Sequence, residues 1–133
     1  PMVLPFMEKD AKSGSHPARY DMSNKRNVLI STCGFYTTEG NYDAVVSMFN
    51  HLLGKDNYEK IFCSQGELFR VPELSHRTSE YLDYVKTAGR EYISSRINDN
   101  TKTKLNTLLF TKETFEAMAD ASWGVEKRDC GKI

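Results

Sequence analysis

The sequence predicts an α/β fold, and three observations in its first half support this prediction. The apolar run Val28-Leu29-Ile30 has no polar residue between its members, which is typical of a strand covered on both faces of a parallel sheet. A stretch with helical spacing follows, and a second strand pattern centred on Ile61 comes after it. Strand, helix and strand joined by short connections form a βαβ unit, in which the two strands are parallel.

The residues before the first strand are predicted to form a loop. Residues 1–7 are mostly apolar, which indicates the end of an element that begins earlier. Residues 8–26 are polar and contain Gly14 and Pro17, which favour irregular structure. The first strand is then expected over residues 28–32.

The helix of the βαβ unit is expected to begin near Asn41, which is a favoured N-cap residue, and to end at Gly54. The residues of its apolar stripe recur every three or four positions. They are Tyr42, Val45, Val46, Phe49, Leu52 and Leu53. The second strand is expected over residues 58–64.

Three further helices are predicted in the second half of the chain. The first is long, over residues 79–97, and Gly89 in its middle indicates close packing, because glycine costs about 1 kcal/mol relative to alanine in a helix. A short helix is expected after Asn100 or Thr101, and Thr111 is expected to cap the last one. The buried face of the long helix is expected to contain Tyr81, Leu82, Val85, Ala88, Gly89, Tyr92 and Ile93.

The chain is expected to form one domain over residues 1–123, followed by a charged, flexible tail over residues 124–133. Phe110 and Phe115 are placed as a hydrophobic staple around the start of the last helix. Two parallel strands cannot bury both faces of a sheet by themselves. The strand near residue 29 is therefore expected to need a neighbour on its other edge that this chain does not supply.

Composition argues against several classes of partner. Lysine plus arginine equals aspartate plus glutamate at 18 each, so nothing favours attraction to nucleic acid or to an anionic membrane. No apolar run approaches the roughly 20 residues of a membrane span. The three cysteines, Cys33, Cys63 and Cys130, are widely spaced, which fits a reducing compartment, and the cytoplasm is the predicted location.

Sequence motifs identify no catalytic residue and no metal site. The chain has no dinucleotide or phosphate loop, no nucleophile elbow, and no histidines at metal-ligand spacing. Cys33 stands at a turn, but no histidine is visibly placed to activate it, so a packing role is favoured. The small residues after the first strand fit either a ligand site at the carboxyl end of a strand or an ordinary turn.

Most of the chain, residues 1–123, resembles the second half of flavodoxin-like NAD(P)H-dependent FMN reductases. The most specific part is Val-Leu-Ile-Ser-Thr-Cys-Gly-Phe at residues 28–35, preceded by His-Pro-Ala-Arg-Tyr-Asp at residues 16–21. The likeness continues through Lys-Thr-Ala-Gly-Arg-Glu at residues 86–91 and through residues 115–123. The resemblance implies a partial flavodoxin-like fold, with the two strands as the fourth and fifth of a 2-1-3-4-5 sheet and an extra carboxyl-terminal helical segment.

The resemblance also implies a cofactor and a site. Thr32, Cys33, Gly34 and Phe35 would border the flavin ring of FMN, and NAD(P)H would reduce it in the complete protein. The family's phosphate-binding loop and its first three strands have no counterpart here, so the chain reads as a carboxyl-terminal half. We therefore expect weak FMN binding or none, and no activity in this chain alone.

A second hypothesis from another class is a non-enzymatic interaction module. An unpaired apolar strand edge is adhesive, so it would recruit a partner without any cofactor. The same edge predicts a homo-oligomer or association with a missing amino-terminal half, either through the first strand or through residues 1–7.

Overall fold

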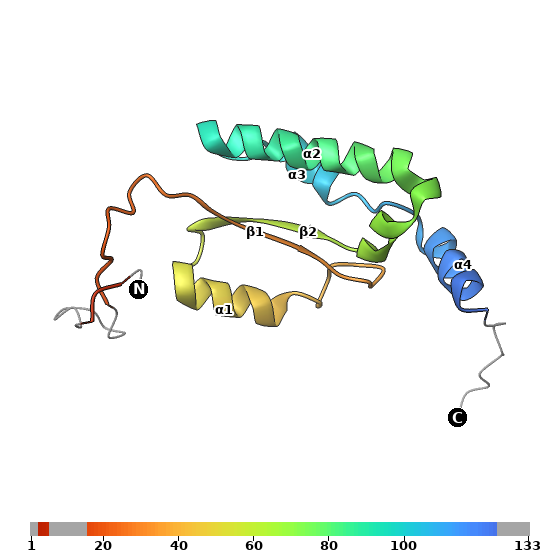
Figure 1. The fold of residues 1–133 in the computed structure, drawn as a ribbon, viewed down its shortest axis with the longest axis horizontal. Coiled ribbons are helices and arrows are strands. Elements are labelled where there is room, and N and C mark those ends of the chain that lie inside the picture. The colour runs from red at the N-terminus through yellow and green to blue at the C-terminus, as the bar shows by residue number, and fades with distance from the viewer. Residues whose placement is uncertain (1–2, 6–15, 125–133) are drawn as a thin grey trace, which may run out of the picture.

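The structure is a computed structural model that describes residues 3–5 and 16–124. Its elements follow one another along a short α/β unit (Figure 1). They are β1 (Asn27–Thr32), α1 (Asp43–Leu53), β2 (Tyr58–Cys63), η1 (Gly66–Arg70), η2 (Pro72–Leu74), α2 (Ser75–Ser94), α3 (Asp99–Leu105) and α4 (Lys112–Trp123).

The predicted βαβ unit is confirmed. β1 and β2 pair in parallel, with Asn27 opposite Tyr58 and Thr32 opposite Cys63. Figure 1 shows α1 on one side of the strand pair and α2 with α3 on the other. The result is a three-layer arrangement in which both faces of a two-stranded sheet carry helices.

The N-cap of the helix of the unit lies one residue later than predicted. Tyr42 occupies the N-cap position of α1, because the side-chain amide of Asn41 donates to the backbone oxygens of Thr37 and Glu39 in the preceding turn instead. The end at Gly54 is confirmed, and this residue has φ +84°, a conformation that glycine adopts without strain.

The long helix α2 is shifted towards the amino terminus relative to the predicted 79–97. Its first turn is fixed by a tertiary contact that the helical pattern does not contain, because the Arg77 guanidinium donates to the carbonyl oxygens of Leu108 and Leu109. The helix ends at Ser94. Ile97 lies in the connection that follows and is 3% exposed, so its apolar character serves the core rather than a helix face.

The last two helices are present. The predicted cap of α3 at Asn100 or Thr101 is wrong, because both residues lie inside the helix and Asn98 takes the N-cap position. The Thr111 cap of α4 is confirmed, since its side-chain oxygen accepts from the backbone N–H of Thr114. Both residues predicted as a staple, Phe110 and Phe115, pack in the hydrophobic core. The predicted tail lies almost entirely outside the described residues.

The core is formed between β2, the 3₁₀ turns and the helices α2 to α4. Its buried members are Ile61, Cys63, Leu68, Tyr81, Ala88, Ile97, Leu105, Leu109 and Phe115. The predicted buried face of α2 is only partly correct. Tyr81 and Ala88 are buried, whereas Leu82, Gly89 and Ile93 are exposed.

The expectation that β1 is covered on both faces is wrong for the described chain. No residue of β1 is buried, and Val28 and Ile30 are 44% and 56% exposed. The physical reason is that the helices on either face of the sheet pack on β2 more closely than on β1, while no strand among the described residues occupies the outer edge of β1. The residues before β1 that are described form no helix or strand beyond an isolated bridge between Val3 and Ala18.

Candidate functional site

The four residues predicted to border a flavin lie together at the carboxyl end of the sheet, beside the loop that follows β2. Thr32 ends β1, and backbone hydrogen bonds continue the pairing past it. The Cys33 N–H donates to the Cys63 oxygen at 3.0 Å, and the Gly66 N–H donates to the Cys33 oxygen at 2.7 Å. The Gln65 N–H donates to the Phe35 oxygen at 2.9 Å. The two loops therefore form one hydrogen-bonded platform.

This platform presents backbone donors and an aromatic ring. The N–H groups of Gly34 and Phe35 donate no hydrogen bond to any described residue, and the Phe35 side chain is 63% exposed. The Glu67 carboxylate lies against Gly34, since a Cβ atom there would come within 2.9 Å of Glu67 Oε2. A side chain at position 34 would therefore displace the end of the Glu67 side chain. The backbone donors can bind the polar edge of a flat ring. The Glu67 carboxylate would repel a ring that carries negative charge.

Gln65 is the residue of this platform that the sequence did not reveal. Its side chain is fully buried and bonds the backbone of Phe110 twice. The amide nitrogen donates to the Phe110 oxygen and the amide oxygen accepts from the Phe110 N–H, each at 2.9 Å. Gln65 also has φ +59°, outside the usual range for a residue with a side chain. A glutamine between two loops carries no sequence signal for such a role.

The groups beneath the platform are held in their neutral forms. Tyr42 stacks on Phe62 at 4.0 Å between ring centroids, and its hydroxyl lies 3.5 Å from the Cys63 oxygen. Burial, together with a hydrogen bond to the Cys33 thiol, raises the pKa of Tyr42 to about 12. Burial also raises the pKa of the Cys63 thiol. The site therefore offers no thiolate at Cys63 and no phenolate at Tyr42 near neutral pH.

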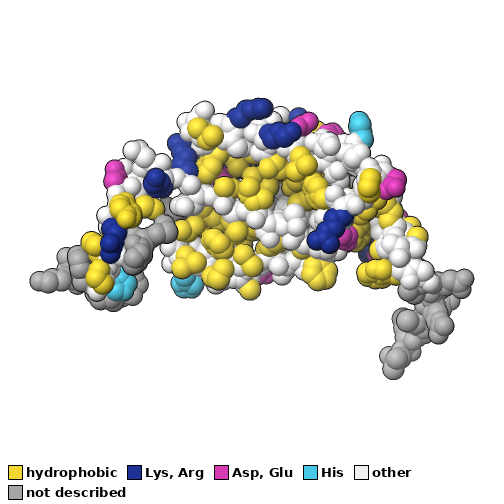
Figure 2. Space-filling view, in the orientation of Figure 1, with side chains coloured by type: hydrophobic (Ala, Val, Ile, Leu, Met, Phe, Trp, Pro, Cys, Tyr) yellow, Lys and Arg dark blue, Asp and Glu magenta, His cyan; other side chains and the backbone are white. Residues whose placement is uncertain are grey.

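A second candidate surface follows the open edge of β1. We call it the β1 edge surface and define it by Val28 and Ile30 on β1 and by Leu82, Gly89 and Ile93 on α2. Leu82 and Ile93 are 45% and 79% exposed. A hollow of about 150 Å³ joins the two elements, with Ile30 and Leu82 in its wall. Figure 2 shows hydrophobic side chains spread over the strand pair and the adjoining sides of the helices.

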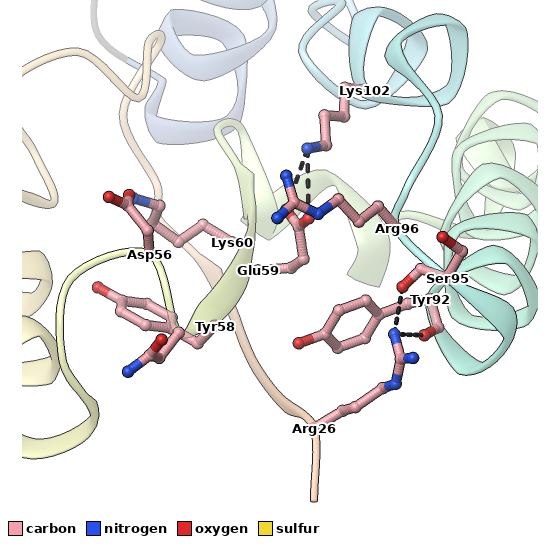
Figure 3. A pocket seen from close by; sticks show the side chains of 10 residues that line it. Arg26, Asp56, Tyr58, Glu59, Lys60, Tyr92, Ser95, Arg96 and Lys102 are labelled. Carbon is pink, nitrogen blue, oxygen red and sulfur yellow. Dashed lines mark hydrogen bonds and ion pairs between the residues drawn. The ribbon is translucent and has the colours of Figure 1, made fainter. Parts of the chain in front are cut away.

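A third feature is a polar cleft of about 490 Å³ at the opposite, amino-terminal end of the strands (Figure 3). Its charges are largely engaged. The Arg26 guanidinium donates to the carbonyl oxygens of Tyr92 and Ser95 at the end of α2, and Lys102 pairs with Glu59 at 3.2 Å. Cations suit the negative end of a helix dipole. The hydrogen bonds of Arg26 therefore attach the segment before β1 to the end of α2.

Comparison with other proteins gives no relative on which to base a function. No family model matches the chain, and neither the curated proteins nor the solved structures contain a significant match. Within residues 3–5 and 16–124, no three His, Cys, Asp or Glu side chains are grouped so that they could hold a metal ion. No helix in that part of the chain is both long and apolar enough to cross a membrane.

Proposed function

We propose that the chain is an interaction module that takes up a further strand along β1 and acts as part of a larger α/β assembly. One observation supports this most strongly. No strand among the described residues occupies the outer edge of β1, and the side chains of Val28 and Ile30 on the face beside that edge are 44% and 56% exposed. Strand addition to such an edge gains main-chain hydrogen bonds along the backbone and specificity from alternate side chains.

The composition of β1 supports the proposal as well. Exposed edges in folded proteins are usually protected by a lysine, a proline or a bulge. β1 has the sequence Asn-Val-Leu-Ile-Ser-Thr, which contains no charge and no proline, and its ladder with β2 has no interruption. An edge that avoids these protective devices suits pairing with a partner strand.

Sedimentation velocity of three proteins over a range of concentrations tests the proposal. Wild type is expected to associate, and Ile30→Lys is expected to abolish association by placing a charge in the paired edge. Trp123→Lys is the matched control, because it replaces another exposed apolar residue, 76% exposed at the end of α4, with the same charge. A circular dichroism melt of each variant establishes that it is folded.

Two outcomes would contradict the proposal. One is a wild-type chain that stays monomeric at all concentrations. The other is association that Trp123→Lys weakens and Ile30→Lys leaves unchanged, which would place the contact at α4.

A second candidate function is the flavin-ring side of an FMN-dependent NAD(P)H oxidoreductase. The observation that favours it is the platform of Thr32, Cys33, Gly34 and Phe35, which lies beyond the carboxyl ends of parallel strands, where ligands bind in open α/β sheets. The free N–H groups and the Phe35 ring fit a flavin edge. FMN would supply hydride transfer, and the platform would position its ring. We place this activity in the cytoplasm, on the basis of cysteines that remain free at Cys33 and Cys63.

Titration of the ¹⁵N-labelled chain with FMN, followed by NMR, tests the second candidate. We expect weak, fast-exchanging shifts confined to residues 32–35 and to the adjoining loop, and their loss in Phe35→Ala. Trp123→Ala, which removes a different exposed aromatic side chain, should leave them unchanged. Shifts centred on the cleft of Figure 3, or shifts at the platform that Phe35→Ala leaves unchanged, would exclude a flavin at the platform.

A further inference from the structure

We infer that the strand completing the edge of β1 is β1 of a second copy of this chain, paired antiparallel about a twofold axis perpendicular to the sheet. This inference rests on the proposed interaction function and names its partner. The four strands would then form one sheet in the order β2, β1, β1 and β2. The evidence is that two layers of the molecule are self-complementary about the same axis.

Symmetry leaves two ways for identical copies to share this edge. An axis parallel to the strands pairs them in parallel but turns one sheet over, so that α1 of one copy lies beside α2 of the other. An axis perpendicular to the sheet pairs them antiparallel and keeps each helix layer on its own face. Only the second arrangement brings the exposed side of α2 against itself.

That side of α2 carries an apolar stripe beside its core face. Leu82, Gly89 and Ile93 are separated by seven and four residues, which places them on one side of a helix. Leu82 lines the same hollow as Ile30, so the stripe stands next to the open edge. Nothing lies within 4 Å of a Cβ atom placed on Gly89. The close packing that this glycine predicts therefore has no partner within the described chain.

The midpoint of the apolar stripe on α2 and the midpoint of β1 lie at the same position along the strand direction. The Tyr92 hydroxyl donates to the Asn27 oxygen at one end of β1. Tyr81 and Thr32 line one hollow at the other end. Eleven residues of helix and five of strand both span about 16 Å. An axis through the centre of β1 therefore passes α2 near residues 86 and 87, and the centre of the stripe lies at residues 87 and 88.

This coincidence makes the stripe complementary to its own copy. With the axis at its centre, Leu82 of one copy faces Ile93 of the second copy, and Gly89 lies close to the axis. α2 lines one hollow together with residues of both β1 and β2, so we place its axis above the line between the two strands. The two copies of α2 would then lie two strand spacings apart, about 9.6 Å. Helices pack at 8–10 Å between their axes, so the sheet geometry alone sets the two helices at contact distance. Small residues such as glycine at such a crossing allow the closest approach.

The area of this contact is sufficient for a dimer. A six-residue strand is about 20 Å long, and three layers of about 10 Å each give roughly 600 Å² per copy. The total of about 1,200 Å² meets the lower limit of stable interfaces. On the other face the same operation sets α1 beside its copy, and α1 exposes Met48 and Leu52.

The inference is tested on the full chain by cross-linking and by one pair of variants. Lys86 lies next to the axis and is exposed, so a short amine-reactive linker should join Lys86 to Lys86 of the second copy. Mixing unlabelled and ¹⁵N-labelled chains identifies that link by mass spectrometry, and Lys112 on α4 should form no such link with itself. Gly89→Phe should weaken dimerisation about tenfold or more by forcing the helices apart. Ser94→Phe, on another side of α2, should not.

The outcomes separate this inference from the proposed function. Association that Ile30→Lys abolishes, without a Lys86 link and without an effect of Gly89→Phe, would retain the edge function and overturn the antiparallel dimer. Association that Ile30→Lys leaves intact would overturn both. Because Gly89 stands in open space, loss of dimer with an unchanged melting profile at low concentration would support the inference.

Discussion

The two strands of this small sheet lie side by side in very different surroundings. β2 has three buried residues, Tyr58, Ile61 and Cys63, and every buried member of the core lies at Ile61 or later in the chain. β1 has none, and α1 has none either. Tyr42 is the exception in the first region, since it is buried and stacks on Phe62 of β2.

The difference shows that β1 is exposed because of its position and not because of its composition. Val28, Leu29 and Ile30 are as apolar as Ile61, Phe62 and Cys63 of β2, and both strands belong to one βαβ unit. Each strand has one edge that no described strand occupies, but β2 contacts α3 and lies over the core helices, whereas no helix packs as closely on β1. The proposed interaction rests on this combination: β1 has the apolar composition of a buried strand, and its side chains remain exposed.

The largest effect should come from truncating a core residue of the second region. Phe115→Ala removes a side chain that is 8% exposed and should lower the free energy of unfolding by about 3–5 kcal/mol. Leu52→Ala in α1, where the side chain is 69% exposed, should change it by less than about 0.5 kcal/mol in the monomer. Urea denaturation at low protein concentration measures both. Equal losses would show that the two regions share one core.

A smaller effect is expected from the link between the β2 loop and the segment before α4. Gln65→Leu removes both side-chain hydrogen bonds to Phe110 and leaves its backbone N–H and oxygen unpaired. Each unpaired buried group costs about 1–3 kcal/mol, so we expect a loss of about 2–4 kcal/mol in urea denaturation. Thr37→Leu is a control in a loop outside the core. A Gln65 variant as stable as wild type would show that the platform does not depend on this contact.

The smallest effect concerns the junction of α2 and α3 and depends on pH. The Glu91 carboxylate accepts hydrogen bonds from the backbone and side chain of Asn98 and from Thr101, which lower its pKa below the ordinary 4.5. A lowered pKa stabilises the fold above pH 4.5, and this stabilisation is lost as pH falls through the lower value in the folded protein. Glu91→Gln should therefore melt at a lower temperature than wild type at pH 7.

The same variant should approach wild type in acid. Melting temperatures measured from pH 7 down to pH 3 check this, with Glu113→Gln as a control carboxylate on exposed α4. A difference between Glu91→Gln and wild type that stays constant with pH would show that the carboxylate acts through its shape and not its charge.

Local patterns predicted the elements of this fold well. The βαβ unit, the stop at Gly54 and the Thr111 cap all follow from spacing and capping, which are properties of neighbouring residues. The start of α2 was missed because Arg77 fixes it through a contact some thirty residues away. The exposure of β1 was missed because its apolar composition predicts burial, whereas its actual exposure depends on which elements lie beside it in the fold.

In the candidate sites too, residues close together in the sequence could be predicted, whereas roles that depend on distant partners could not. The residues of the platform are contiguous in sequence, and the resemblance to FMN reductases singled them out where the local pattern fitted either a site or an ordinary turn. Their role toward FMN remains a prediction. Gln65 was not foreseen, because its burial depends on a partner 45 residues away. The prediction that Gly89 marks close packing within the chain is wrong for the described residues, because nothing lies within 4 Å of a Cβ atom placed there.

Amide hydrogen exchange at increasing protein concentration tests most directly whether β1 is an interface. We expect the β1 amides that point away from β2 to exchange quickly at low concentration and to become protected as copies associate, while the amides bonded between β1 and β2 stay protected throughout. Outward-pointing β1 amides that are already protected in a monomer, or that stay unprotected in the associated protein, would contradict the proposed interface.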